Sequence, residues 1–468
     1  MKRTSTTLIA LGLTLTLAVS CAQQADGQFL GAGPGEGPDA PQVSDDPSAV
    51  AQRAVDDVTA FWIDTYPEVY GDDFEELQGF YPYGPDTEMP PCGPFQISYE
   101  EIADNAFYCP DDDIIAWDEG RLMPALNEEF GAFTVAIVIA HEFGHAVQAR
   151  FGTGDRTVDL ELQADCFAGA WTQRVANGDA DGFDPGMVDL DKTVAGMIAI
   201  RDVPGTSPDE VGAHGSGFDR VSAFQDGYQN GAATCEAYAD ESEDRRTAEI
   251  PFQTDVEDRT GGNLPLEDDW DGQGSQGLLS LVETDLNEYY GQLFDELGEQ
   301  FTPVGDLRVV DPDVDDVTCG GEDLSGDDLT RAAVYCVDEN VVVLDGPNLA
   351  EVMSDEIGDF AVAAEVARLW ALAAQDQLGV ADGDDAALQA DCLTGSWGAW
   401  TFPTGPENQS QSGTLTMSAG DLDEGLMGFL AYPTETGAGG ATVFDRADAL
   451  RTGFIEGYDA CEEFGPLG

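Results

Sequence analysis

Positively charged side chains are scarce in this chain. Its 468 residues include 92 Asp and Glu but only 18 Lys and Arg, which gives a formal net charge of -74. A surface of this sign repels phosphate groups, so binding driven by nucleic acid or by anionic lipid headgroups is excluded. Such a surface could attract cations or basic peptides. We favour the simpler interpretation that it serves solubility or adaptation to high salt.

Apolar segments of membrane-spanning length are also lacking. The N-terminus comes nearest: Met-Lys-Arg precedes an apolar run at residues 8–19, which is too short to cross a bilayer and is typical of an export signal. The run ends near Cys21, which resembles the acylated residue of bacterial lipoproteins; cleavage by an ordinary signal peptidase nearby is the alternative. We expect a lipoprotein-type signal peptide at 1–21 and a disordered Gly- and Pro-rich tether at 22–48. The protein is then exported, and either anchored to the outer face of the cell membrane or secreted.

Histidine is scarce too, and two of the three histidines lie in one segment. Apolar residues 135–140 continue without a helix breaker into His141, Glu142 and His145. On a helix, His141 and His145 leave the same face and can hold one zinc ion. Glu142 can reach a water on that ion and act as its general base. A chance match on an ordinary amphipathic helix is the alternative.

A catalytic zinc needs a third protein ligand, and Glu161 is the strongest candidate. Glu161 and Asp165 are four residues apart, so they share one helical face. Glu161 can bind the metal while Asp165 accepts a hydrogen bond from the outer ring nitrogen of a ligand histidine. The alternative is a solvated acidic pair, which this composition supplies freely.

The third histidine, His214, opens the segment His-Gly-Ser-Gly-Phe-Asp-Arg. As a catalytic residue it could stabilise the oxyanion of a tetrahedral intermediate or position the substrate. It could equally be a helix-entry residue whose side chain bonds the backbone. Zinc ligation in place of Glu161 is a further alternative.

The nine cysteines reveal an internal repeat. The last four follow an earlier four at offsets of 227 residues for the first two and 226 for the second two, and neighbouring residues agree in the same register. We therefore expect two tandem copies of one domain, at 49–240 and 276–468, joined by an acidic linker at 241–275. The repeated cysteines are Cys92, Cys109, Cys166 and Cys235, followed by Cys319, Cys336, Cys392 and Cys461.

The eight repeated cysteines leave only Cys21 unpaired, which suits lipidation. In an exported protein the eight are expected to form disulfides, although ligation of a soft metal ion is the alternative. Closing the short first loop would stabilise the fold by about 3 kcal/mol. The pairing that we favour is Cys92–Cys109, Cys166–Cys235, Cys319–Cys336 and Cys392–Cys461.

The second copy lacks each residue proposed for the metal site. In register, His141, Glu142, His145, Glu161 and His214 are replaced by Arg368, Leu369, Leu372, Ala387 and Gly440, whereas Asp391 and Cys392 persist. This pattern predicts a catalytic domain followed by a degenerate copy without metal.

Residues 90–240 resemble the bacterial neutral zinc metallopeptidase family. The resemblance rests on Phe107-Tyr-Cys-Pro110, His141-Glu-Phe-Gly-His145, Glu161-Leu-Gln-Ala-Asp-Cys-Phe-Ala-Gly169 and His214-Gly-Ser216. It implies a zincin-like α+β fold, mainly helical, with Glu as third ligand. An edge strand beside the active-site helix binds the peptide in such folds, and Ile114–Trp117 would be that strand. Ala146, where the family commonly has His, is a departure that affects no ligand.

Two functions fit these observations. The first is an exported zinc peptidase that acts on a peptide or protein substrate, binds no nucleic acid and touches the membrane only through its lipid anchor. The second is a non-enzymatic surface lipoprotein, in which the zinc site is structural and the second copy is a binding module. The second copy could also cap the active-site cleft of a peptidase. The oligomeric state and the peptide specificity stay open.

Overall fold

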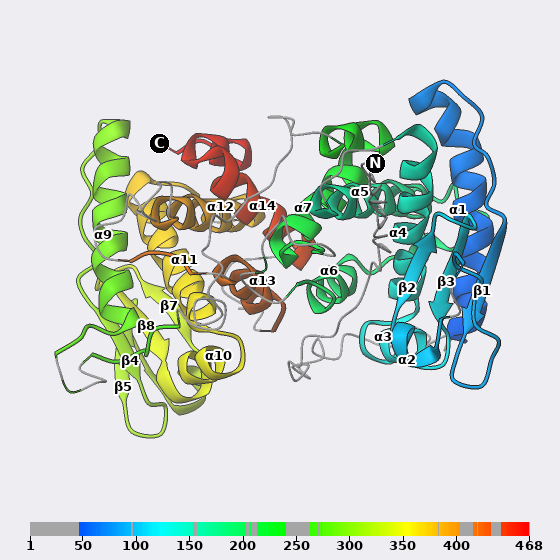
Figure 1. Ribbon diagram of the computed structural model, residues 1–468. Helices are drawn as coiled ribbons and strands as arrows, with labels where there is room; N and C mark the ends of the chain where they lie inside the picture. Colours follow the sequence, from blue (N-terminus) through cyan, green and yellow to red (C-terminus); the bar gives the residue numbers. More distant parts are fainter. Residues whose placement is uncertain are drawn as a thin grey trace, which may run out of the picture.

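The computed structural model describes residues 46–94, 97–152, 157–202, 206, 213–239, 263–268, 272, 274–381, 383–402, 415–418, 420–431 and 441–467. The expected signal peptide with Cys21, the tether up to residue 45 and residues 241–262 of the expected linker lie outside these ranges. Gly440 lies outside them as well. The described chain is mainly helical with small sheets, and it forms two halves that lie side by side (Figure 1).

The first half is the blue-to-green part of Figure 1, and its longest helices are α1, α4 and α5. Its elements are α1 (Pro47–Tyr70), β1 (Gly79–Tyr83), α2 (Tyr99–Ile102), β2 (Ala106–Cys109), β3 (Ile114–Asp118), α3 (Leu122–Phe130), α4 (Ala132–Phe151), α5 (Thr157–Ala176), η1 (Pro185–Met187), α6 (Leu190–Ala199), α7 (Gly217–Asn230) and η2 (Ala232–Tyr238). Helix α7 ends before Gly231, whose φ of 79° separates it from η2.

The second half runs from green to red in Figure 1. Its elements are α9 (Leu278–Leu297), β4 (Leu307–Val310), β5 (Asp316–Cys319), β6 (Glu322–Ser325), η3 (Gly326–Asp328), β7 (Ala333–Cys336), β8 (Val341–Asp345), η4 (Gly346–Ala350), α10 (Glu351–Glu356), α11 (Asp359–Leu378), α12 (Asp384–Thr401), α13 (Asp421–Ala431), α14 (Val443–Glu456) and η5 (Tyr458–Phe464).

The two three-stranded sheets have the same strand order and directions. In the first, β3 lies between a parallel β1 and an antiparallel β2; in the second, β8 lies between a parallel β4 and an antiparallel β7. The second half adds the two-stranded β5–β6 ladder.

The expectation that Ile114–Trp117 is an edge strand is wrong. These residues belong to β3, the central strand, and all five of its residues are buried. A continuous apolar run is what a strand covered on both faces requires. The edge strands are β1, where Pro82 is tolerated because an edge position needs no amide donor, and β2, which contacts α4.

Helix α4 is the described helix that is long and apolar enough to cross a membrane, with a mean hydropathy of 1.2 over its most apolar 18-residue window. The expectation that only the N-terminal run approaches this character is therefore wrong. Of that window, 83% is buried inside the fold, where α1, α3 and α5 pack against the helix. The apolar run before the histidines is thus explained by burial in the core.

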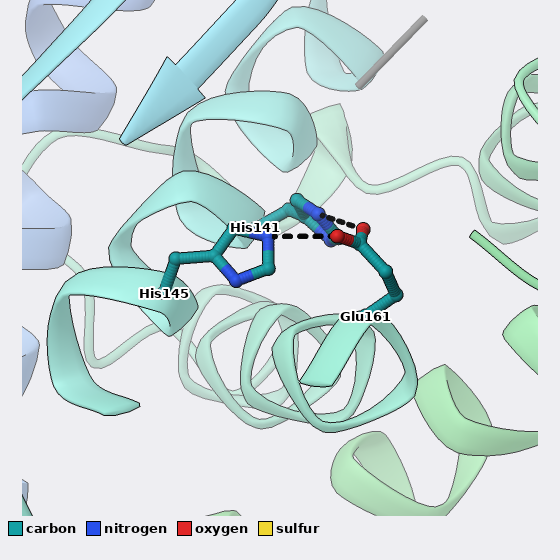
Figure 2. Close-up of side chains that lie close together, drawn as sticks. All are labelled: His141, His145 and Glu161. Carbon is teal, nitrogen blue, oxygen red and sulfur yellow. Dashed lines mark ion pairs between the residues drawn. The ribbon is translucent and has the colours of Figure 1, made fainter. Parts of the chain in front are cut away.

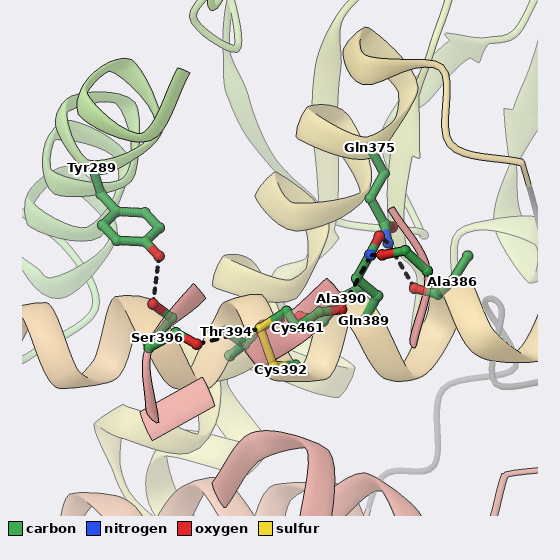
Figure 3. Close-up of a disulfide and its surroundings, with 11 residues drawn as sticks. Tyr289, Gln375, Ala386, Gln389, Ala390, Cys392, Thr394, Ser396 and Cys461 are labelled. Carbon is green, nitrogen blue, oxygen red and sulfur yellow. Dashed lines mark hydrogen bonds between the residues drawn. A yellow bond between two sulfur atoms is a disulfide. The ribbon is translucent and has the colours of Figure 1, made fainter. Parts of the chain in front are cut away.

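The predicted disulfide pairing is confirmed in both halves. Cys92–Cys109 and Cys319–Cys336 each close a separation of 17 residues, and Cys166–Cys235 and Cys392–Cys461 each close a separation of 69. Figure 3 shows the last of these on α12. The longer bridges connect the central helices α5 and α12 to the ends of their halves.

Glycine allows α5 and α7 to touch backbone to backbone. A Cβ atom on Gly227 would lie 1.8 Å from the Cys166 carbonyl oxygen, and one on Gly169 would lie 2.0 Å from that of Phe224. Gly453 and Gly395 allow the same close approach between α14 and α12, where added Cβ atoms would lie 1.8 and 1.9 Å from the facing carbonyl oxygens. This close packing fixes α7 against the helix that carries Glu161.

The halves meet through α6 and α7 on one side and α13 and α14 on the other, in the middle of Figure 1. The contacts come in reciprocal pairs. The Phe218 amide donates to Asp423 Oδ1 at 2.8 Å, and the Phe444 amide donates to Asp191 Oδ1 at 3.1 Å. Reciprocal contacts of this kind are what a two-fold interface between similar surfaces produces.

Candidate metal centre

Helices α4 and α5 bring His141, His145 and Glu161 together (Figure 2). The Nε2 atom of His141 lies 3.2 Å from one Glu161 oxygen, and the Nε2 atom of His145 lies 3.4 Å from the other. The two imidazole rings stand nearly perpendicular, at 88°. His141 and Glu161 are almost completely buried, whereas the side chain of His145 is 11% exposed.

The donor set and its spacing fit zinc. Bond lengths of about 2.0–2.1 Å and tetrahedral angles place neighbouring ligand atoms about 3.3 Å apart. Two imidazole nitrogens and one carboxylate are a ligand set that catalytic zinc uses, with a fourth position for water. The three residues form one of two candidate metal-binding groups within the described ranges, and His214 is not a member of it. The geometry therefore favours Glu161 over His214 as the third ligand.

The outer nitrogen of each ligand histidine has its own acceptor. His141 Nδ1 lies 2.8 Å from Asp165 Oδ1, and His145 Nδ1 lies 2.9 Å from Gln148 Oε1. Gln148 donates its amide nitrogen to the Leu160 carbonyl at 2.6 Å, so its oxygen is the atom that faces His145. Because both partners accept, both protons lie on Nδ1 and both Nε2 atoms are left to bind metal.

Arg220 on α7 holds Asp165 in place. Its Nε donates to Asp165 Oδ2 at 2.8 Å and its Nη2 donates to Oδ1 at 3.0 Å, while Nη1 donates to the Ile200 carbonyl at 2.9 Å. Burial alone would raise the pKa of Asp165, but Arg220 and His141 together lower it below its usual value. The carboxylate that orients His141 therefore stays ionised.

Glu161 is ionised for a related reason. Burial would raise its pKa, but His145 and His141 together hold it well below the usual value. The neighbouring Glu142 is fully buried on α4. Burial, then Asp118 and then Glu142 raise the pKa of Tyr83, the last residue of β1.

His214 lies just before α7 and is held by Asp202. Asp202 Oδ2 accepts from the amides of His214 and Gly215 at 2.7 and 2.8 Å, and Oδ1 lies 3.1 Å from His214 Nδ1. The side chain thus bonds a carboxylate, whereas the helix-entry interpretation has it bonded to the backbone. Ser216 is the residue that caps α7, since its hydroxyl accepts from the Asp219 amide.

A small cavity adjoins the metal group. Its wall is chiefly apolar and comes from α3, α4 and α6, with His141, Asp165 and Arg220 at its polar side. The apolar lining residues are Leu122, Leu126, Ile137, Val138, Met197 and Ile200.

Sequence reasoning missed three residues of this site. Gln148 carried a usable signal, because it follows His145 by three residues and shares its helical face. Arg220 and Asp202 carried none, since they reach Asp165 and His214 only through the packing of α6 and α7.

The second half contains equivalents of the supporting residues but not of the metal ligands. Arg368 and Arg446 donate through Nε to Asp391 at 3.0 and 2.8 Å. Gln375 donates to the Ala386 carbonyl at 2.8 Å, as Gln148 does to Leu160 (Figure 3). A guanidinium group offers only donors and cannot bind a cation. The position of His141 is therefore filled by a fixed positive charge.

Residues 11–238 match the family model described as "Putative neutral zinc metallopeptidase". This part of the chain belongs to that family. Two proteins to which the chain is similar are the uncharacterized protein Rv2575 of Mycobacterium tuberculosis, 30% identical over 166 residues, and the uncharacterized protein YpfJ of Escherichia coli strain K12, 29% identical over 158 residues. The matches cover 30% and 28% of this chain, and it spans about half the length of each relative, 55% and 53%.

No solved structure matches this chain. The family name implies zinc, and the group formed by His141, His145 and Glu161 is a site that can hold it. The four disulfides are typical of an extracytoplasmic protein.

Proposed function

We propose that the chain is an exported zinc peptidase with one active site, formed by the first half. The observation that carries this proposal is the meeting of His141 Nε2, His145 Nε2 and Glu161 at about zinc-ligand spacing, with each outer nitrogen held by an acceptor. A structural zinc is normally enclosed by four protein ligands, whereas three protein ligands leave a position open for chemistry.

Bound zinc lowers the pKa of water and polarises a substrate carbonyl. The chain itself supplies the proton transfer. Glu142, one residue from His141 on α4, takes the proton of the attacking water and passes it to the amine that leaves as the peptide bond breaks. Its complete burial keeps bulk water away from that carboxylate.

His214 is proposed to act on the developing oxyanion. Asp202 at Nδ1 favours the charged imidazole, which can then donate from Nε2 to the substrate oxygen. The substrate is a peptide or protein segment in extended form. We propose that it pairs with β2, because β2 is the sheet edge that contacts α4.

We propose that the two halves arose by tandem duplication. This is supported by the common strand order, the equal disulfide separations and the paired Asp165 and Asp391 networks. We also propose the lipid anchor at Cys21, which confines the enzyme to the membrane surface.

The second half has a supporting role in this proposal. Asp423 on α13 pairs with Arg201 Nε at 2.9 Å and accepts from the Phe218 amide at 2.8 Å. Arg201 directly precedes Asp202 in the chain, and Phe218 follows His214 by four residues. The second half therefore buttresses both ends of the segment that carries His214, which favours a structural partner of the active site over an unrelated domain.

The non-enzymatic alternative is favoured by one observation, the intact fold of a half whose metal position is filled by Arg368. A Glu142→Gln variant separates the two functions, because Gln keeps the shape of the side chain but cannot take a proton. We expect the full-length variant to bind zinc like the wild type and to cleave a peptide library 10²–10⁴-fold more slowly, as loss of a general base requires.

His141→Ala is the companion variant and should lose both zinc and cleavage. If Glu142→Gln cleaved peptides at the wild-type rate, the peptidase mechanism would be wrong. If neither the wild type nor the variant cleaved any peptide while zinc still raised the melting temperature, the structural-zinc alternative would replace it.

A further inference from the structure

A second group of candidate ligands lies in the second half, away from the zinc site. Oxygen atoms of Asp359, Asp421 and Glu424 all lie within 4.8 Å of one another. Asp359 begins α11, and the other two lie in the first turn of α13, which packs against α11 (Figure 1). Their exposed fractions are 4%, 5% and 8%, so three carboxylates are crowded together out of water.

The described residues donate hydrogen bonds to only some of the oxygen atoms in this group. Asp359 Oδ2 accepts from the Leu264 amide at 2.7 Å, Glu424 Oε2 accepts from the Phe360 amide at 3.0 Å, and Asp421 accepts from Ser418. Asp359 Oδ1 is buried and has no hydrogen-bond partner within the described residues. No Lys, Arg or His of the described ranges forms an ion pair with any of the three carboxylates. A buried anionic oxygen left in this state is costly unless something outside the chain binds it.

The corresponding corner of the first half contains its own cation. There Lys192 on α6 pairs with Asp189 at 3.3 Å, and its side chain lies against Gly131, the residue before α4. In the second half the residue before α11 is Gly358, and the side chain against it is that of Glu424. The side chain of a glutamate thus lies where the first half has the side chain of a lysine.

The reciprocal contacts between the halves support this correspondence. Asp191 on α6 and Asp423 on α13 accept from the amides at the starts of α14 and α7. Aligning those two aspartates pairs Lys192 with Glu424 and Asp189 with Asp421. The second half therefore has a carboxylate where the first half has Lys192, and the neighbouring aspartate is present in both.

We propose that Asp359, Asp421 and Glu424 bind a divalent cation, calcium by preference, which joins the starts of α11 and α13. Three carboxylates are hard oxygen ligands, which calcium prefers, whereas zinc prefers the nitrogen-containing set of the first half. The cation replaces the charge that Lys192 supplies in the first half. Because Asp423 is on the same helix, the site also steadies the helix that docks onto α6 and α7.

The test is calcium binding by the full-length protein after chelation, measured by equilibrium dialysis and by thermal unfolding in concentrated KCl. The salt suppresses loose binding to the acidic surface. We expect one tightly held calcium ion per chain and a higher melting temperature when calcium is added. Glu424→Gln should lose that ion, and Asp421→Asn provides a second variant should the first fold poorly.

Three further variants sharpen the result. Glu424→Lys reproduces the lysine of the first half, so it should melt at a higher temperature than the calcium-free wild type and ignore calcium. Glu322→Gln, on the exposed β6 strand, is the matched control and should keep the calcium response. His141→Ala should also keep it, which separates this site from the zinc site.

Three results would overturn the proposal. The first is a wild-type protein that binds no calcium. The second is binding that survives in both Glu424→Gln and Asp421→Asn, since the ion would then lie elsewhere on the acidic surface. The third is a melting temperature that rises on acidification but not with calcium, because protons alone would then neutralise the carboxylates.

Discussion

At the scale of single residues, the orientation of the ligand histidines depends on acceptors that bind no metal themselves. Asp165 fixes His141, Arg220 fixes Asp165, and Gln148 fixes His145. Such supporting groups keep the proton on Nδ1 and raise the basicity of the ligand nitrogen. We therefore expect the affinity for zinc to depend on these supporting residues as well as on the ligands.

Asp165→Asn tests this supporting layer. The amide cannot stabilise the His141 N–H as a carboxylate does, so we expect zinc affinity to fall 10–100-fold, measured by competition with a chelator. Asp391→Asn is the matched control, because Asp391 has the equivalent partner Arg446 but lies in the half that lacks the zinc ligands. Both variants should lose stability, and only Asp165→Asn should lose affinity for zinc. An equal loss of affinity in both would mean that the effect is global.

How much of the site the sequence could predict depends on how local each interaction is. His141, His145 and Glu161 could be predicted from the sequence, because helical periodicity alone places His141 and His145 on one helical face. The same periodicity places Glu161 and Asp165 on one face of the next helix. Asp202 and Arg220 could not be predicted, because their roles arise only when α6 and α7 pack beside α5. The same limit explains the error over Ile114–Trp117: the apolar run revealed a strand, but its neighbours in the sheet come from distant segments.

At the scale of elements, the contact between α5 and α7 tolerates little change. Gly227 lies where any side chain would overlap the Cys166 carbonyl. Gly453 follows Gly227 at the 226-residue offset of the repeat, but the offset does not explain why both residues are glycine. The reason is the backbone contact, which both halves use to pack their central helices.

Gly227→Ala should therefore destabilise the protein by about 3 kcal/mol, at the upper end of the usual cost of overpacking, because a helix must move to make room. Gly291→Ala on α9 is the control, since a Cβ atom there meets nothing within 4 Å. It should be neutral or stabilise by about 0.5–1 kcal/mol. Denaturant unfolding measures both. Equal midpoints for the two variants would show that the helices can separate at no cost.

At the scale of the whole molecule, the interface between the halves is reciprocal in form but unequal in consequence. Asp423 accepts from the Phe218 amide, close to His214, whereas Asp191 accepts from the Phe444 amide at the start of α14, in the half that lacks the zinc ligands. The same kind of contact thus supports the proposed active site on one side only.

Asp423→Ala should lower kcat about tenfold and leave zinc content unchanged, because His214 is displaced while the ligands stay. Asp191→Ala removes the opposite contact of the same interface and should leave kcat close to that of the wild type. Steady-state kinetics on a cleaved peptide compares the two. If both variants lost activity equally, general weakening of the interface would explain the result, and Asp423 would have no specific role.

The number of zinc ions per chain tests the central claim most directly. The measurement is metal analysis of the purified full-length protein, in wild-type form and as His141→Ala and Glu161→Ala. The first half offers His141, His145 and Glu161, and the second offers Arg368 where a ligand would be needed. We predict one zinc in the wild type and none in either variant. Two zinc ions in the wild type, or one retained by both variants, would contradict the account.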